Sequence, residues 1–173
     1  MEPYLRQIGF IEKRINNSKY GYYLKGLLRN SKIIYVSQSG LKMYVKQKYG
    51  ITLYRNPDEA YIIKKDESQI IIKILEKKEQ HREGSVEIKL WAGPSLKREY
   101  EIILANCAHN FVVEYAYCVN KFLLEKFKSN NKKYNILGQI LDENHIVVLC
   151  GDEPDYQESI ERWILSLNNC GLF

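Results

Sequence analysis

The chain has 173 residues, of which 45% are hydrophobic and 27% charged, a composition typical of a soluble globular protein. This length favours a single domain, 1–173, with a substantial core. The sequence contains no apolar run of about 18 residues, so we expect no membrane-spanning helix. It begins without a secretory signal, and its four cysteines form no C-x-x-C pair. We therefore expect a cytoplasmic protein with reduced cysteines and no zinc.

The net charge of +5 is distributed unevenly along the chain. Residues 1–50 contain ten lysines or arginines and only two acids, Glu2 and Glu12, whereas the remainder is weakly acidic. A basic N-terminal third suits contact with a phosphate backbone. The alternative is an ordinary lysine-rich surface in contact with water.

In chain order, the first 50 residues are predicted to be mainly helical, a basic helical part ahead of a core at 51–173. The apolar residues Leu5, Ile8, Ile11 and Ile15 recur at near-helical spacing after Pro3, and a second helical stripe covers 20–28. A short strand is expected at 32–36. The next helix is predicted to begin after Ser39 and to end at Gly50.

Two isoleucine-rich runs, 60–65 and 69–75, are separated by the polar residues 66–68 and predict a β-hairpin. If the turn is centred on Glu67, Asp58 lies opposite Glu76. Because side chains alternate between the two faces of a strand, Glu76, Lys78 and Gln80 share one side. Two carboxylates and an ammonium group are therefore expected to converge at one end of the hairpin.

These residue types fit metal-assisted hydrolysis of a phosphodiester. Mg²⁺ prefers carboxylate oxygens, which Asp58 and Glu76 supply, and Mn²⁺ is a possible substitute. Lys78 is placed to orient the attacking water and to offset charge on the phosphate, with Gln80 as a supporting hydrogen-bond partner. The alternative is ordinary sheet surface, because a Glu-x-Lys pair is common and Glu87-Ile88-Lys89 is a second copy.

After the hairpin, Ser85 is expected to cap a helix that Gly93-Pro94 interrupts. Downstream we expect strands at 111–119, 134–141 and 145–150 and helices at 120–128 and 156–168. This order indicates an α/β fold with a mixed central sheet flanked by helices. Some polar side chains near the hairpin are candidates for DNA contact: Arg55, Ser85, Lys89, Lys97 and Arg98. The alternatives are a turn at Arg55, the helix cap at Ser85, and ordinary helix solvation for each of the other three.

Pro57-Asp58 followed by Glu76-Lys77-Lys78 resembles the motif of the PD-(D/E)XK nuclease superfamily. The longer segment 76–101, with its EKK-x-Q and Gly-Ser-Val strings, resembles small restriction-type endonucleases of bacteria and large DNA viruses, over roughly residues 36–125. The resemblance implies a restriction-endonuclease-like fold and a metal-dependent endonuclease. In it Asp58 and Glu76 are metal ligands, with the backbone carbonyl of Lys77 as a further one, and Lys78 is the catalytic lysine.

Many nucleases of this superfamily carry an additional acid on a helix before the motif. Glu12 is the candidate here, and a surface glutamate is the alternative. The expected substrate is double-stranded DNA, and cleavage of both strands favours a homodimer. Two other classes stay open: a structure-specific, nicking or repair nuclease of the same chemistry, and a DNA-binding protein without catalytic activity.

Overall fold

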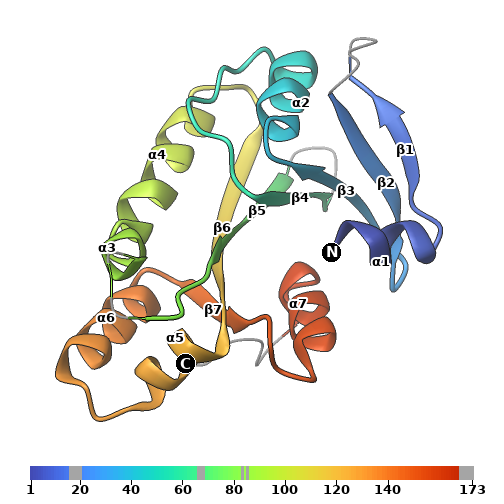
Figure 1. Ribbon diagram of the computed structural model, residues 1–173. Helices are drawn as coiled ribbons and strands as arrows, with labels where there is room; N and C mark the ends of the chain where they lie inside the picture. The colour runs from blue at the N-terminus through green and yellow to red at the C-terminus, as the bar shows by residue number, and fades with distance from the viewer. Residues whose placement is uncertain (16–20, 66–68, 83, 85, 168–173) are drawn as a thin grey trace. The chain divides into compact units, whose positions relative to one another are not determined.

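A computed structural model describes residues 1–15, 21–65, 69–82, 84 and 86–167. Within these residues the chain forms one mixed sheet in the order β1-β2-β3-β4-β5-β6-β7, flanked by helices, which confirms the expected α/β fold (Figure 1). The strands are β1 (Ile11–Arg14), β2 (Tyr22–Leu28), β3 (Ser31–Ser37), β4 (Glu59–Lys64), β5 (Gln69–Lys78), β6 (Asn110–Val119) and β7 (Ile146–Cys150). The helices are α1 (Glu2–Gln7), α2 (Gly40–Tyr49), α3 (Val86–Trp91), α4 (Gly93–Ala105), α5 (Lys121–Lys128), α6 (Lys132–Glu143) and α7 (Tyr156–Ile164).

The sheet is mixed because its two ends are built differently. Strands β1 to β4 form an antiparallel meander, in which Arg29 and Asn30 make the turn from β2 to β3 and the connection from β3 to β4 contains α2. Strands β6 and β7 run parallel, which requires the crossover that α5 and α6 provide. The chain divides into two compact units, one made of Met1–Ile74 with Glu99–Val113 and the other of Leu75–Arg98 with Glu114–Phe173. These units do not follow the division at residue 50 that charge and periodicity indicated.

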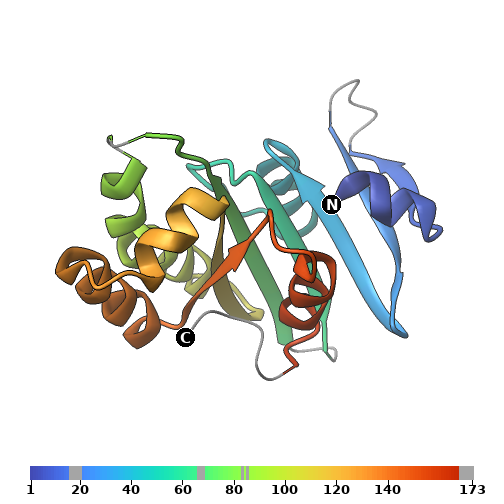
Figure 2. The same cartoon turned by 60° about the horizontal axis from the view of Figure 1, so that its bottom comes forward.

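In the first unit, α1 and α2 pack on opposite faces of the meander. The Phe10 ring that follows α1 fills the space above Gly26, where an added Cβ would lie 2.4 Å from a ring carbon. On the other face Tyr44 of α2 packs edge-on against Tyr23 of β2, with ring centroids 5.2 Å apart. Figure 2 shows α1 close against the first two strands. The expected limits of α2 are confirmed, because Gly50 ends the helix in a left-handed conformation.

The prediction that residues 1–50 are mainly helical is wrong. Among the described residues of this segment only α1 and α2 are helical, and β1, β2 and β3 occupy most of the others. Leu24 and Leu28 face the side covered by α1, whereas Tyr23 faces the side covered by α2. Because both faces of β2 are partly covered, its apolar residues lose the simple alternation of a half-buried strand and mimic a helical stripe.

In the second unit, helices α6 and α7 pack against β7, and α5 packs against α6. Residues 134–141 were expected to form a strand, but they lie within α6. Tyr134, Leu137 and Leu141 are buried at helical spacing there. The break at Gly93 is confirmed, since α3 ends at Trp91 and α4 begins at Gly93. In α7 the side chains of Ile160, Trp163 and Ile164 are buried. This helix was expected to reach residue 168 but ends at Ile164, and Leu167 beyond it is 43% exposed.

No helix in the described part of the chain combines the length and apolar character needed to cross a bilayer. The described cysteines, Cys107, Cys118 and Cys150, are all free thiols.

Candidate active site

The candidate site is built on the hairpin of β4 and β5. At its turn end, the Lys65 amide donates a hydrogen bond to the Gln69 carbonyl at 3.1 Å. This pairing is the one required by a turn centred on Glu67, a residue that itself lies outside the described residues. Six consecutive residues, 70–75, are buried in β5, and the strand then ends in polar residues. A buried strand, apolar except for Lys73, therefore carries the polar residues 76–80 out of the core.

The last residues of β5 alternate in exposure as the sequence predicts. Glu76, Lys78 and Gln80 are partly or fully buried, whereas Lys77 and Glu79 are exposed. Lys78 Nζ donates a hydrogen bond to Glu76 Oε2 at 2.7 Å, with only 15% of the lysine side chain and 18% of the glutamate side chain exposed. A charge-assisted bond of this length in a half-buried position holds the ammonium and the carboxylate in fixed relative positions.

Tyr117 of β6 supports this pair from beneath. Lys78 Nζ lies 6.0 Å from the centroid of its ring, within the range of a cation–π interaction. The Tyr117 hydroxyl donates a hydrogen bond to the Lys89 carbonyl at 2.9 Å, which ties β6 to α3. Burial raises the pKa of Tyr117, and the nearby Glu76 carboxylate raises it further, so the phenol stays neutral and remains a donor.

Asn120 joins the end of β5 to the start of α5. Its side-chain Nδ2 donates to the Gln80 carbonyl at 2.8 Å, and its Oδ1 accepts a longer bond of 3.4 Å from the Gln80 amide. The same Oδ1 accepts from the Leu123 amide and so caps α5. Gln80 is 6% exposed, and its Nε2 donates to the Arg82 carbonyl at 2.7 Å. Its Oε1 is buried with no hydrogen-bond partner among the described residues.

Asp58 lies in the first unit, at the entrance to β4, where it is half-buried. Its backbone carbonyl accepts a hydrogen bond from the Gln38 amide at 3.2 Å, which anchors the start of β4 beside β3. The next residue, Glu59, is a buried carboxylate that accepts a 2.7 Å hydrogen bond from the Tyr61 hydroxyl. The convergence of Asp58 with Glu76 remains a prediction from the hairpin register.

The donor set fits a hard divalent cation in type. Glu76 supplies a carboxylate, the ligand type that Mg²⁺ prefers, and one of its two oxygens accepts the bond from Lys78. Nowhere in the described ranges do three or more His, Cys, Asp or Glu side chains gather as they would around a metal ion. The arrangement expected from the sequence uses only two carboxylates, with water and phosphate oxygens completing the shell.

The candidate DNA-contacting residues are differently engaged. Arg55 forms an ion pair with Glu99, Nε to Oε2 at 2.8 Å, and Lys97 Nζ donates to the Asn144 carbonyl at 2.8 Å. Both cations therefore already have protein partners. Lys89 and Arg98 are exposed on α3 and α4. Ser85, the expected cap of α3, lies outside the described residues.

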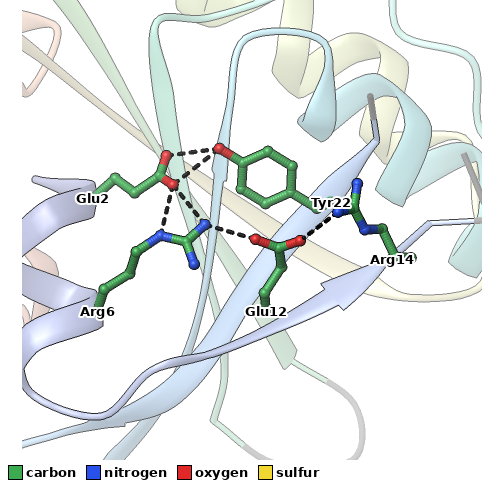
Figure 3. A network of polar contacts seen from close by, with 5 residues as sticks. All are labelled: Glu2, Arg6, Glu12, Arg14 and Tyr22. Carbon is green, nitrogen blue, oxygen red and sulfur yellow. Dashed lines mark hydrogen bonds and ion pairs between the residues drawn. The ribbon is translucent and has the colours of Figure 1, made fainter. Parts of the chain in front are cut away.

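The resemblance to nucleases that carry an additional acid on a helix required Glu12 to be helical, but Glu12 lies on β1. Its carboxylate is bound by two guanidinium groups, Arg6 at 2.8 Å and Arg14 at 3.0 Å (Figure 3). Arg6 also bonds Glu2, which in turn accepts from the Tyr22 hydroxyl. The hydrogen bond from Arg6 lowers the pKa of Glu12, so the group stays ionised. This network accounts for the carboxylate without a metal.

Two residues of the site were not found by sequence reasoning, Tyr117 and Asn120. A weak signal existed for each. Tyr117 alternates with Tyr115 inside an apolar strand, and an asparagine directly before a helix is a common N-cap. Nothing in the sequence connects either residue to β5, which lies about 40 positions away, because that connection depends on how β6 and α5 pack.

No protein-family model matches this sequence, and searches of curated proteins and of solved structures find no match. A functional inference must therefore come from the residues of the chain and their geometry.

Proposed function

We propose that this protein is a Mg²⁺-dependent DNA endonuclease of restriction type, with the PD-(D/E)XK arrangement that its sequence resembles. The observation that carries the proposal is the 2.7 Å pair of Lys78 and Glu76, half-buried at the end of a strand whose buried residues are apolar except for Lys73. Burying two charges at a strand end is costly, and ordinary sheet surface gives no reason for it. A site that must hold a carboxylate and an ammonium group near a phosphate gives a reason for this cost.

Each residue has a definite task in this proposal. Glu76 and, from the predicted register, Asp58 hold the cation, with the Lys77 carbonyl as a further ligand. A cation held there would supply Lewis acidity, polarising the phosphate and lowering the pKa of a bound water. Lys78, held by Glu76 and Tyr117, orients the attacking water and offsets charge on the phosphate oxygens. The water oxygen bonds to phosphorus, one P–O ester bond breaks, and the departing oxygen takes a proton to become a hydroxyl.

The expected substrate is double-stranded DNA in an intracellular setting. One active site of this type cuts one strand, so cleavage of both strands by so small a chain requires two copies, and we propose a homodimer.

Plasmid cleavage tests the proposal. Wild-type protein is incubated with supercoiled DNA and Mg²⁺, alongside Lys78→Ala, Glu76→Gln and Asp58→Asn variants and a sample with EDTA. Each substitution is expected to slow cleavage by roughly 10²–10³-fold, the cost of losing one preorganised electrostatic group, and EDTA is expected to abolish it. Lys128→Ala is the matched control, because it removes an exposed lysine at the end of α5.

The products distinguish the alternatives. Discrete fragments indicate sequence-specific cleavage, whereas nicked circles or cuts confined to branched DNA indicate a nicking or repair enzyme with the same residues. DNA binding with no cleavage of plasmid, single-stranded or branched DNA would replace the proposal with a binding function. Cleavage that survives both EDTA and Lys78→Ala would show that the activity belongs to other residues.

A further inference from the structure

One face of the N-terminal meander carries lysines and no acid. In an antiparallel pair, residues opposite each other point to the same face, and Ile11 lies opposite Lys25, Lys13 opposite Tyr23, and Leu27 opposite Lys32. Alternation along β1 and β2 places all of them on one side. We call Ile11, Lys13, Lys25, Leu27 and Lys32 the lysine face. All five side chains are exposed, Ile11 by 62% and Leu27 by 57%.

The acids of this region lie on the opposite face. Glu12 alternates with Ile11 and Lys13 along β1, so it points away from the lysine face. The other acid among the first 50 residues, Glu2, is held by Arg6 and the Tyr22 hydroxyl in the network of Figure 3. The meander thus sorts its charges: the carboxylates neutralise arginines on one face, and the lysines are collected on the other.

Helices α1 and α2 extend this separation. Helix α1 covers the acidic face, with Phe10 against Gly26. Helix α2 packs at the Tyr23 end of the lysine face through Tyr44, and it contains Lys42, Lys46 and Lys48 but no acid. The positive surface therefore continues from the strands onto α2. Among the described residues, no ion pair is formed by Lys13, Lys25 or Lys32.

The spacing of the lysines suits a chain of phosphates. Lys25 is a diagonal neighbour of both Lys13 and Lys32, and such neighbours are roughly 7–8 Å apart. The three lysines therefore span about 15 Å, a length along which one DNA strand carries about four phosphates. Like charges gathered at this distance repel one another, and a polyanion that lies across them removes the repulsion.

We propose that the lysine face binds the phosphate backbone of duplex DNA without regard to sequence and so holds the substrate of the nuclease proposed above. This inference rests on that proposed function for its choice of partner. An anionic membrane is the less suitable ligand, because membrane-surface binding needs a broad, exposed apolar face. Of the described apolar residues on this face, Ile11 and Leu27 are exposed, whereas Tyr23 and Ile34 are partly covered.

The test measures binding without cleavage. A fluorescently labelled 20-base-pair duplex is titrated in EDTA at several salt concentrations, and the slope of log K against log salt is compared between variants. Each phosphate contact contributes about 0.9 to this slope. The triple variant, which combines Lys13→Gln, Lys25→Gln and Lys32→Gln, is expected to have a slope smaller by about 2.7. At 0.1 M salt this corresponds to roughly 500-fold weaker binding.

A charge-matched control removes three exposed lysines of the second unit, Lys121, Lys128 and Lys132, and is expected to change the slope by less than about 0.9. Arginine at the three lysine-face positions is expected to keep the wild-type slope. Each single substitution, such as Lys25→Gln, is expected to lower the slope by about 0.9, so the test does not depend on the triple variant folding.

An unchanged slope in the triple variant, or an equal loss in the control, overturns the inference. So does binding to vesicles of anionic phospholipid that depends on these lysines while DNA binding does not. The outcome is separable from that of the proposed function. DNA binding that depends on these lysines, without any cleavage, supports the proposed role of the lysine face and rejects the nuclease proposal. Mg²⁺-dependent cleavage, with DNA binding unchanged in the triple variant, supports the nuclease proposal and rejects the role of the lysine face.

Discussion

Asn120 offers the sharpest test of how the candidate site is held together. Replacing it with alanine removes the N-cap of α5, which costs about 1 kcal/mol of the free energy of unfolding. It also leaves the part-buried Gln80 carbonyl without its 2.8 Å donor, at a cost of about 1–3 kcal/mol. We therefore expect Asn120→Ala to lower the stability by about 2–4 kcal/mol.

Two further variants separate these contributions. Asn131 caps α6 in a similar way, with its Oδ1 accepting from the Lys133 amide at 3.0 Å, but it is exposed and this hydrogen bond is local. Asn131→Ala should therefore cost only about 1 kcal/mol. Asn120→Asp keeps an acceptor for the Leu123 amide but loses the donor to the Gln80 carbonyl. Its free energy of unfolding should therefore lie between those of the two alanine variants.

Urea unfolding at neutral pH measures the free energy of unfolding of all three variants, and the m-value checks that the unfolded state is unchanged. A loss in Asn120→Ala no larger than that in Asn131→Ala would refute the claim that Asn120 fastens the end of β5. If the proposed function is right, Asn120→Ala should also slow cleavage by up to about 10²-fold, because small displacements of catalytic groups are costly. DNA affinity in EDTA should stay unchanged.

Two other predictions concern Tyr117 and the buried tyrosines. Gly93→Ala should lower the free energy of unfolding, measured in urea, by about 1 kcal/mol. The new Cβ would lie 3.0 Å from the Tyr117 ring and 3.2 Å from Ile146, and this overpacking outweighs the gain in helix propensity. An increase in stability would contradict this prediction. Burial raises the pKa values of Tyr35, Tyr44 and Tyr117, so the native state keeps phenol protons that the unfolded state loses. Stability is then fully present below about pH 10 and falls above it, by about 1.4 kcal/mol per pH unit for each such group. Unfolding free energies measured across that range should fall less steeply in Tyr44→Phe than in wild type, and equal slopes would count against the assignment.

The local part of this structure could be predicted from the sequence. The hairpin of β4 and β5 follows from two isoleucine-rich runs around a polar turn, and the end of α2 follows from Gly50. The face shared by Glu76 and Lys78 follows from the two-residue period of a strand. Each of these features depends on residues within a few positions of one another, where backbone preference and periodicity act directly.

Where the hydrophobic periodicity was ambiguous, only the tertiary structure decided between helix and strand. Residues 22–28 look helical in sequence because β2 is partly covered on both faces, by α1 and by α2. Residues 134–141 look like a strand because Ile136, which is 50% exposed, adds an apolar residue on the outer side of α6. In both segments, the faces that become buried depend on elements distant in the sequence.

The same reason applies to the candidate site. The sequence alone locates Glu76 and Lys78, but the contacts that hold them come from Tyr117 and Asn120, about 40 residues further along the chain. The expected position of Glu12 on a helix was wrong, because residues 11–14 form β1, where Arg6 and Arg14 bind its carboxylate. Hydrogen bonds and ion pairs between distant residues exist only after the strands and helices have packed, and no local pattern of residues encodes them.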